Sequence, residues 1–291
     1  MINVAFGFND AYAKFCGVTV ASILANHKIL SPVDKLNFFF LGNISKENKE
    51  KMFELKKIQD CQMSFINMDD NLFKDLPMGT WDYSTCYRLL IPEVLPAGEK
   101  KVIYLDCDII LNRDIKEFWD INIDGYYLSA LYGKLSPYDD NEMYFNAGVM
   151  LLNLQTLRDF NYKDKWRDFA KHNVNPDRFM FPDQDILNGI IKDKILPLDS
   201  KFNMLMSHFS DFKGQIEDIV VIHLGGFKPW QPTCKHPLKE MYFIYAAMVP
   251  WKIKRESYLV YSLKFFKKHP LFFLQAKYWK ILKNLFFHKN N

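Results

Sequence analysis

Cysteine is scarce in this sequence and follows no pairing pattern. The chain has five cysteines in 291 residues, an odd number, and none belongs to a Cys-x-x-Cys motif. A scattered, odd set does not suit a disulfide framework, and isolated thiols usually act as small core hydrophobes. Folding in a reducing compartment is therefore the simpler interpretation.

Long apolar runs and a secretory leader are also missing. Although 49% of the residues are hydrophobic, lysine interrupts every apolar run of the C-terminal tail, and no run reaches the length of a membrane span. The first residues, Met1 to Phe6, already predict a strand and have no basic segment ahead of them. We therefore expect a cytoplasmic catalytic body.

Acidic residues nearly disappear after Pro250, where ten Lys and Arg residues accompany the single acid Glu256. That segment carries a charge of +9, and the preceding 250 residues, with 28 basic and 33 acidic side chains, carry −5. The hydrophobic content and the 16% of aromatic residues exclude disorder over most of the length. Length and charge together predict one large domain over residues 1–250 and an appendage over 251–291.

The appendage has the pattern of an amphipathic helix. Between Leu271 and Phe287 apolar residues recur at helical spacing, while Lys277, Lys280 and Lys283 fall largely on another face. A basic, aromatic helix of this kind is typical of a peripheral anchor on an anionic membrane surface, here the inner face of the cell membrane. A C-terminal helix packed on the domain is the alternative. Nucleic-acid binding is not expected, because no base-reading module accompanies the charge.

The segment Val102 to Ile110 organises the rest of the chain. Its apolar, β-branched residues predict a buried strand that delivers Asp106 and Asp108 to its tip, with Cys107 turned the other way. In an open α/β sheet the carboxyl ends of the strands face a ligand crevice. Two hard oxygen donors at that place suit Mn²⁺ or Mg²⁺ holding a diphosphate. An Asp-x-Asp pair alone is a weak signal, because such pairs are common on solvated loops.

Strands and helices alternate around that segment. We predict strands at about 2–8, 36–41, 63–66, 127–131, 195–198 and 219–222, and helices at about 10–24, 45–58, 81–90 and 163–171. This repeat predicts a mostly parallel α/β sheet flanked by helices. Asn9 and Asp10 occupy the first strand-to-helix turn, where a nucleotide sits in doubly wound folds; plain capping of the helix is the alternative.

Segments before and after the central strand contain further candidate binding residues. Arg88 lies among apolar residues and requires an anion, which could be a structural ion pair, a diphosphate or a sugar-contacting carboxylate. Asn146 and Ala147 stand at the mouth of a long apolar strand, where small residues allow a ligand to approach the backbone; a β-bulge is the alternative. The polar segment 136–143 ahead of them indicates an exposed insertion able to shape an acceptor pocket.

Two later segments add side chains with suitable chemistry. Pro182 predicts a helix start, and helix capping explains Asp183 but not Gln184 and Asp185. His223 ends a buried strand as Asp106 does, and a lone histidine there is more often a satisfied core group than a ligand. Glycines and a lysine follow it, however, and these can meet phosphate oxygens. Two carboxylates and an imidazole would form a credible Mn²⁺ site.

With these pieces in place, the chain resembles the retaining glycosyltransferases of family 8. That group contains bacterial lipopolysaccharide galactosyl- and glucosyltransferases, and glycogenin is similar to it. The resemblance covers about residues 2–230 and is carried in order by Tyr-Leu-Asp-x-Asp at 104–108, Phe-Asn-Ala-Gly-Val at 145–149, Asp-Gln-Asp-Ile-Leu-Asn at 183–188 and His-x-Gly-Gly-x-Lys-Pro-Trp at 223–230. It implies a GT-A fold that binds a UDP-hexose with Mn²⁺, or with Mg²⁺ as the alternative metal.

The resemblance also implies a role for each motif residue. The metal ligands would be Asp106, Asp108 and His223, and the diphosphate would be held by Gly225 and Lys228. Around the donor sugar would lie Arg88, Asn146, Ala147, Asp183 and Gln184. Asn9 takes the place near the uracil where relatives often carry Asp, and an asparagine can still hydrogen-bond an imide edge.

For the reaction, the resemblance implies transfer of galactose or glucose to a glycan or glycolipid acceptor with retained configuration. Gln184 lies where the family has its candidate nucleophile or stabiliser; Asp185 is a second candidate, and Asp183 completes the set. Because an amide is a poor nucleophile, we favour same-face attack, in which the UDP oxygen takes the acceptor proton. An inverting GT-A transferase is one alternative. A non-catalytic, membrane-associated protein that binds nucleotide sugars or glycans is the other.

Overall fold

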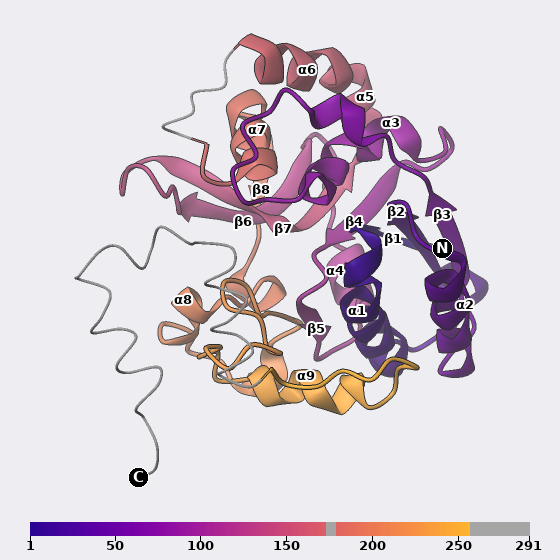
Figure 1. Ribbon diagram of the computed structural model, residues 1–291. Coiled ribbons are helices and arrows are strands. Elements are labelled where there is room, and N and C mark those ends of the chain that lie inside the picture. The colour runs from indigo at the N-terminus through magenta and orange to yellow at the C-terminus, as the bar shows by residue number, and fades with distance from the viewer. Residues whose placement is uncertain (173–178, 257–291) are drawn as a thin grey trace, which may run out of the picture.

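A seven-stranded sheet forms the centre of the computed structural model, which describes residues 1–172 and 179–256 (Figure 1). Its strands lie side by side in the order β3-β2-β1-β4-β7-β6-β8. The bounds are β1 Ile2–Gly7, β2 Leu36–Leu41, β3 Gln62–Ile66, β4 Lys101–Leu105, β6 Leu128–Lys134, β7 Met143–Asn153 and β8 Ile195–Pro197. A second, two-stranded sheet pairs β5 (Ile109–Leu111) with β9 (Val221–His223).

Most neighbouring strands of the large sheet are parallel. The pairs β1/β2, β2/β3, β1/β4 and β6/β8 are parallel, whereas β7 runs antiparallel to both β4 and β6. Parallel strands need crossover connections, which here are helices. The predicted mostly parallel α/β sheet is therefore confirmed, with β7 as the reversed strand.

Helices cover both faces of this sheet (Figure 1). One group consists of α1 Ala13–Asn26, α2 Lys46–Glu54, α4 Lys116–Trp119 and α9 Lys239–Ala246. The other consists of α3 Ile91–Val94, α5 Leu154–Asp159, α6 Tyr162–His172 and α7 Pro182–Ile190. A further short helix, α8, spans Met206–Phe209. Within the described residues, no helix is both long and apolar enough to cross a bilayer.

The two helical layers produce two hydrophobic cores. Along β4, Ile103 and Leu105 belong to the core on the α1 face, while Val102 and Tyr104 belong to the core on the α7 face. This alternation follows from the two-residue side-chain period of a strand. Strands buried on both faces have near-continuous hydrophobic sequences, which explains the apolar run that ends at Leu105.

The structure corrects some of the predicted bounds. The central strand ends at Leu105, and 109–111 forms the separate strand β5 rather than its continuation. Residues 83–90 form a 3-10 helix, and Pro92 lies in the first turn of α3, which follows it directly. Proline fits the first turn because the N–H it lacks has no intrahelical acceptor there. The predicted helix over 271–287 lies outside the described residues.

Candidate active site

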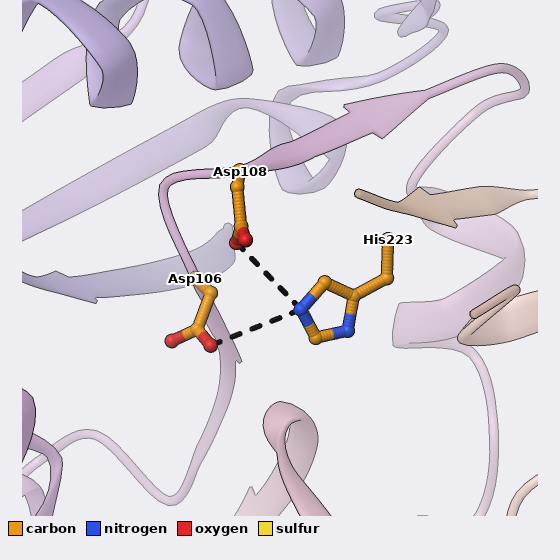
Figure 2. Close-up of side chains that lie close together, drawn as sticks. All are labelled: Asp106, Asp108 and His223. Atoms are coloured by element: carbon orange, nitrogen blue, oxygen red, sulfur yellow. Dashed lines mark ion pairs between the residues drawn. The ribbon is translucent and has the colours of Figure 1, made fainter. Parts of the chain in front are cut away.

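Asp106, Asp108 and His223 converge at the carboxyl end of β4 (Figure 2). The carboxylates follow β4 directly, and the β5/β9 ladder pairs Ile109 with His223, which brings the histidine opposite them. Nε2 of His223 lies 3.9 Å from Oδ2 of Asp106 and 3.6 Å from Oδ1 of Asp108. Three potential ligand atoms, from the turn after β4 and from the end of β9, thus lie within 4.8 Å of one another.

Each carboxylate uses its other oxygen to bind the protein. Oδ1 of Asp106 accepts hydrogen bonds from Nη2 of Arg88 at 2.8 Å and from the Tyr104 hydroxyl at 3.0 Å. Oδ2 of Asp108 pairs with the Lys228 ammonium. The oxygens that face His223 are therefore held in place from behind, which is what a preformed cation site requires.

Asp108 remains ionised although its side chain is only 4% exposed. Burial alone raises the pKa of a carboxyl group. The positive charge of Lys228 outweighs burial and holds the pKa of Asp108 well below its usual range. Cys107 is turned into the core, where its carbonyl accepts a hydrogen bond from Oγ1 of Thr19 at 3.1 Å. The sequence-based placement of these residues is confirmed.

Arg88 joins two of the acidic side chains. Its guanidinium pairs with Asp106 and, through Nε, with Oδ2 of Asp183 at 2.9 Å, and Nη1 donates to the Ala147 carbonyl at 2.7 Å. The anionic partners of Arg88 are thus the carboxylates of Asp106 and Asp183, which are both predicted site residues. Burial raises the pKa of Asp183 to about 6. Arg88 lowers this pKa, but it shares its positive charge with Asp106, whose negative charge raises the pKa of Asp183 further.

Gln184 is anchored to β7 rather than to its own helix. Its Oε1 accepts hydrogen bonds from the Ala147 amide at 2.8 Å and from Nδ2 of Asn146 at 3.2 Å. The pairing of β6 with β7 shifts register between Ala130 and Tyr132, opposite residues 146–149. The strand pairing is therefore irregular here, as the β-bulge alternative expects, and the Ala147 amide at this irregularity donates to Gln184 of α7.

Asp185, in the first turn of α7, is held by two tyrosines. Its carboxylate accepts the hydroxyls of Tyr144 at 2.5 Å and Tyr138 at 2.6 Å, and the Phe181 amide at 2.8 Å. These bonds fix the start of α7 and attach the 136–143 segment to it. They give Asp185 a structural explanation that the sequence did not provide.

The first strand-to-helix turn is used for capping. Oδ1 of Asn9 accepts the Tyr12 amide at 3.2 Å, and Oδ1 of Asp10 accepts the Ser45 amide at 2.8 Å and Nδ2 of Asn48 at 2.9 Å. Both residues follow β1, the parallel neighbour of β4, and Tyr12 lies near enough to Lys228 and Asp108 for their charges to act on its hydroxyl. The turn therefore borders the acidic cluster. The capping alternative holds for Asn9, whereas Asp10 binds the segment that begins α2.

Asn203 is the site residue that sequence reasoning missed. It is fully buried, and its Oδ1 lies 2.8 Å from Nδ1 of His223. The available signal was a single polar residue between the apolar Phe202 and Met204, which costs free energy unless it is hydrogen-bonded. That signal marks a buried asparagine but does not identify its partner.

The space around the three ligand atoms suits a small cation. Gly148 faces them, and a Cβ atom at this position would lie only 2.5 Å from Cε1 of His223 and 2.6 Å from Oδ2 of Asp106. Gly225 also borders the imidazole, since a Cβ there would be 3.4 Å from Nε2 of His223. Two carboxylate oxygens and one imidazole nitrogen are donors that divalent cations such as Mn²⁺ accept. The residues therefore fit a metal ion.

Comparison with known proteins decides the family. Residues 3–234 match the family model described as "Glycosyl transferase family 8". The chain belongs to this family. It is a family 8 glycosyltransferase, and all four motifs of the sequence analysis lie inside the matched residues.

Curated relatives cover most of the chain. General stress protein A of Bacillus subtilis is 26% identical over 266 residues, covering 84% of this chain and 92% of its own. A putative glycosyltransferase of Haemophilus influenzae is 30% identical, with 81% and 74% covered. The lipopolysaccharide 1,3-galactosyltransferase of Salmonella typhimurium is 26% identical, with 86% and 79% covered.

Solved structures show that the family 8 glycosyltransferase fold is shared. The galactosyltransferase LgtC, in complex with donor and acceptor sugar analogs, superposes with a TM-score of 0.74 at 24% identity and covers 86% of this chain and 97% of its own. The glycosyltransferase GlyE of Streptococcus pneumoniae superposes with a TM-score of 0.63 at 21% identity, with 84% and 61% covered. The predicted GT-A fold is thereby confirmed.

Proposed function

We propose that this enzyme transfers galactose or glucose from a UDP-sugar to a glycan acceptor with retention of configuration. The observation that carries the proposal is the convergence of Asp106, Asp108 and His223 at the end of β4. The acceptor class is supported by relatives named as lipopolysaccharide 1,3-galactosyltransferase and lipopolysaccharide 1,2-glucosyltransferase. A lipopolysaccharide, lipooligosaccharide or other lipid-linked glycan is therefore the proposed acceptor.

Asp106, Asp108 and His223 would hold the metal ion, proposed as Mn²⁺, with Mg²⁺ as the alternative. When bound, the ion supplies positive charge that stabilises the departing diphosphate. Lys228 adds a second positive charge at the same place, and the adjacent Gly225 leaves the backbone accessible to phosphate oxygens. Asn9 and Asp10, at the turn after β1, are proposed to border the uracil and its ribose.

Donor-sugar contacts are proposed for Asn146 and Ala147 of β7, for Asp183 and Gln184 of α7, and for Arg88. Arg88 ties Asp183 to Asp106, so the sugar-facing and the cation-facing acids are held by one guanidinium. Asn146 and Ala147 fix the amide of Gln184. Preorganised groups of this kind accelerate transfer because they need not reorient as charge develops on the sugar.

The proposed transfer is a same-face substitution. The bond from the anomeric carbon to the UDP oxygen breaks, the acceptor oxygen forms a bond to the same carbon, and the acceptor proton passes to the UDP oxygen. Gln184 is a poor nucleophile, and its Oε1 already accepts two hydrogen bonds, which supports a stabilising rather than a covalent role. Asp185, whose carboxylate accepts three hydrogen bonds, is proposed to position α7 and not to attack the sugar.

A donor screen tests the proposal. Purified protein is incubated with Mn²⁺ and a panel of UDP- and GDP-sugars, and nucleotide release is measured with Asp108→Asn as the inactive control. Release from UDP-galactose or UDP-glucose that requires Mn²⁺ is expected, and NMR of the product should show the donor's anomeric configuration. An inverted product would indicate the inverting mechanism. Binding without release would indicate a non-catalytic protein.

The basic tail is proposed to bring the enzyme to the anionic inner face of the membrane. Trp251 donates through Nε1 to Asn48 at 2.9 Å, and the Glu256 amide donates to the Trp230 carbonyl at 2.7 Å, so residues 251–256 contact the domain. A truncation should therefore be placed after Glu256 rather than after Pro250. The truncated enzyme is expected to lose binding to anionic liposomes and to retain UDP-sugar hydrolysis. Unchanged liposome binding would contradict this proposal.

A further inference from the structure

Asn203 connects the histidine of the acidic cluster to the β7 residues that hold Gln184. It follows the 3-10 turn at Ser200–Phe202, is fully buried and lies one residue before Met204, whose carbonyl accepts the His223 amide at 3.1 Å. Its side-chain amide lies between two others: Oδ1 is 2.8 Å from Nδ1 of His223, and Nδ2 is 3.0 Å from Oδ1 of Asn146. A side chain so placed touches no solvent and serves only these neighbours.

Backbone amides of β7 determine the direction of each hydrogen bond in the series of side chains that runs from His223 to Asn146. The Gly148 N–H can only donate, and it donates at 3.1 Å to the Asn146 atom that also faces Asn203, so that atom is the oxygen. The Asn203 atom that faces it must then be the nitrogen. The other Asn203 atom, facing Nδ1 of His223, is consequently the oxygen, and Nδ1 must carry a proton.

The same logic applies at the other end. The Ala147 N–H donates at 2.8 Å to a Gln184 atom, which must be Oε1, and Nδ2 of Asn146 donates to the same oxygen at 3.2 Å. The series His223, Asn203, Asn146, Gln184 therefore has one polarity throughout, set by two backbone N–H groups. No reversal of a single amide satisfies the remaining bonds.

We propose that Asn203 is a positioning residue that keeps His223 in the tautomer with its proton on Nδ1 and holds Asn146 in the orientation that fixes Gln184. In that tautomer the lone pair of Nε2 faces Oδ2 of Asp106 and Oδ1 of Asp108, as a metal ligand requires. The opposite tautomer would direct an N–H at the cation. This role rests on the proposed function only for its consequence in metal binding and transfer, because the tautomer itself is a property of the metal-free protein.

Two substitutions separate the two halves of the role. Asn203→Leu keeps the branching at Cγ, although leucine is larger, and removes both hydrogen bonds. Asn203→Asp keeps an oxygen for Nδ1 of His223 but cannot donate to Asn146. Asn37→Leu is the matched control, because Asn37 is likewise buried; it lies on β2 and donates to Oδ1 of Asn3 at 3.0 Å, outside the site.

The first experiment measures the His223 tautomer in metal-free protein by ¹⁵N NMR of the imidazole nitrogens, with the signal assigned by its loss in His223→Gln. Wild type, Asn203→Asp and Asn37→Leu should show a protonated Nδ1. Asn203→Leu should show a mixture of tautomers or protonated Nε2. An unchanged spectrum in Asn203→Leu would overturn the proposal.

The second experiment measures Mn²⁺ affinity in the presence of UDP by EPR, and kcat and KM for the donor. Asn203→Leu should weaken Mn²⁺ binding about 10–100-fold. Asn203→Asp should bind Mn²⁺ as wild type does but have a lower kcat, because only the Asn146 and Gln184 half is disturbed. Wild-type affinity in Asn203→Leu would contradict the role of Asn203. Absence of Mn²⁺ binding in wild type would instead contradict the proposed function, and the tautomer spectrum would still decide on Asn203.

Discussion

Gly148 and His223 approach so closely that no side chain fits between them: a Cβ atom on Gly148 would lie 2.5 Å from Cε1 of His223. The same atom would lie 2.6 Å from Oδ2 of Asp106. Real contacts of this kind are longer, so one of the two ligands would have to move. The absent side chain at position 148 is thus part of the geometry that brings the acid and the imidazole together.

Gly148→Ala is therefore predicted to weaken metal binding more than it weakens the fold. Overpacking of this kind costs about 1–3 kcal/mol, and the atoms that must give way are the proposed ligands themselves. We expect Mn²⁺ affinity, measured by EPR with UDP present, to fall at least tenfold. Gly133→Ala on β6 is the control, because a Cβ there meets no atom within 4 Å. Equal Mn²⁺ affinity in both variants would contradict the site geometry.

Arg88→Met is predicted to destabilise the folded protein strongly. Arg88 is 8% exposed and is shared by Asp106 and Asp183, so its removal leaves a buried carboxylate without a counter-charge. Such a loss costs about 3–5 kcal/mol in the free energy of unfolding, measured by urea denaturation. Arg113→Met breaks the exposed pair with Glu117 and should cost less than about 1 kcal/mol. Similar losses of unfolding free energy in the two variants would show that the buried ion pairs of Arg88 stabilise the fold no more than an exposed pair does.

Stability should depend on pH through Asp183. Its pKa of about 6 lies above the value of about 3.9 for an unfolded aspartate, so the folded state binds this proton more tightly. Its contribution is fully present below about pH 4 and is lost as pH rises through about 6. Relative to Asp183→Asn, the wild type should lose roughly 2–3 kcal/mol of unfolding free energy across that window. A constant difference between pH 4 and 7 would contradict the raised pKa.

Asp185→Asn distinguishes a structural acid from a nucleophile. The amide would turn an N–H toward either the Phe181 amide or a tyrosine hydroxyl, so we expect a loss of about 1–3 kcal/mol in stability. Transfer rates measured well below the melting temperature should stay within about tenfold of wild type. Loss of transfer in a variant of unchanged stability would instead identify Asp185 as the nucleophile.

Much of the fold and site could be predicted because the signals are local. The β4 segment alternates between two buried faces and then ends in charge, so its strand, its tip and the inward turn of Cys107 follow from sequence alone. Pro182 begins α7 as predicted. A lone histidine after a strand has several explanations, and the place of His223 near the acids depends on the β5/β9 pairing, which has no local signal.

The missed features are those set by contacts between distant segments. Asn203 belongs to no regular strand, and its partners lie 20 and 57 residues away. The tyrosines that hold Asp185 come from residues 138 and 144, more than 40 positions earlier in the chain. The reversed direction of β7 also has no local signature, because the same apolar run would suit a parallel strand. Periodicity cannot predict such pairings; only the folded topology defines them.

The central claim is that Asp106, Asp108 and His223 bind one divalent cation together. The most direct test is anomalous diffraction at the manganese edge from crystals of the full chain soaked with MnCl₂ and UDP. We predict a single strong peak within bonding distance of Oδ2 of Asp106, Oδ1 of Asp108 and Nε2 of His223, which is absent from Asp108→Asn crystals treated in the same way. A manganese peak elsewhere, or none at these three atoms, would contradict the account.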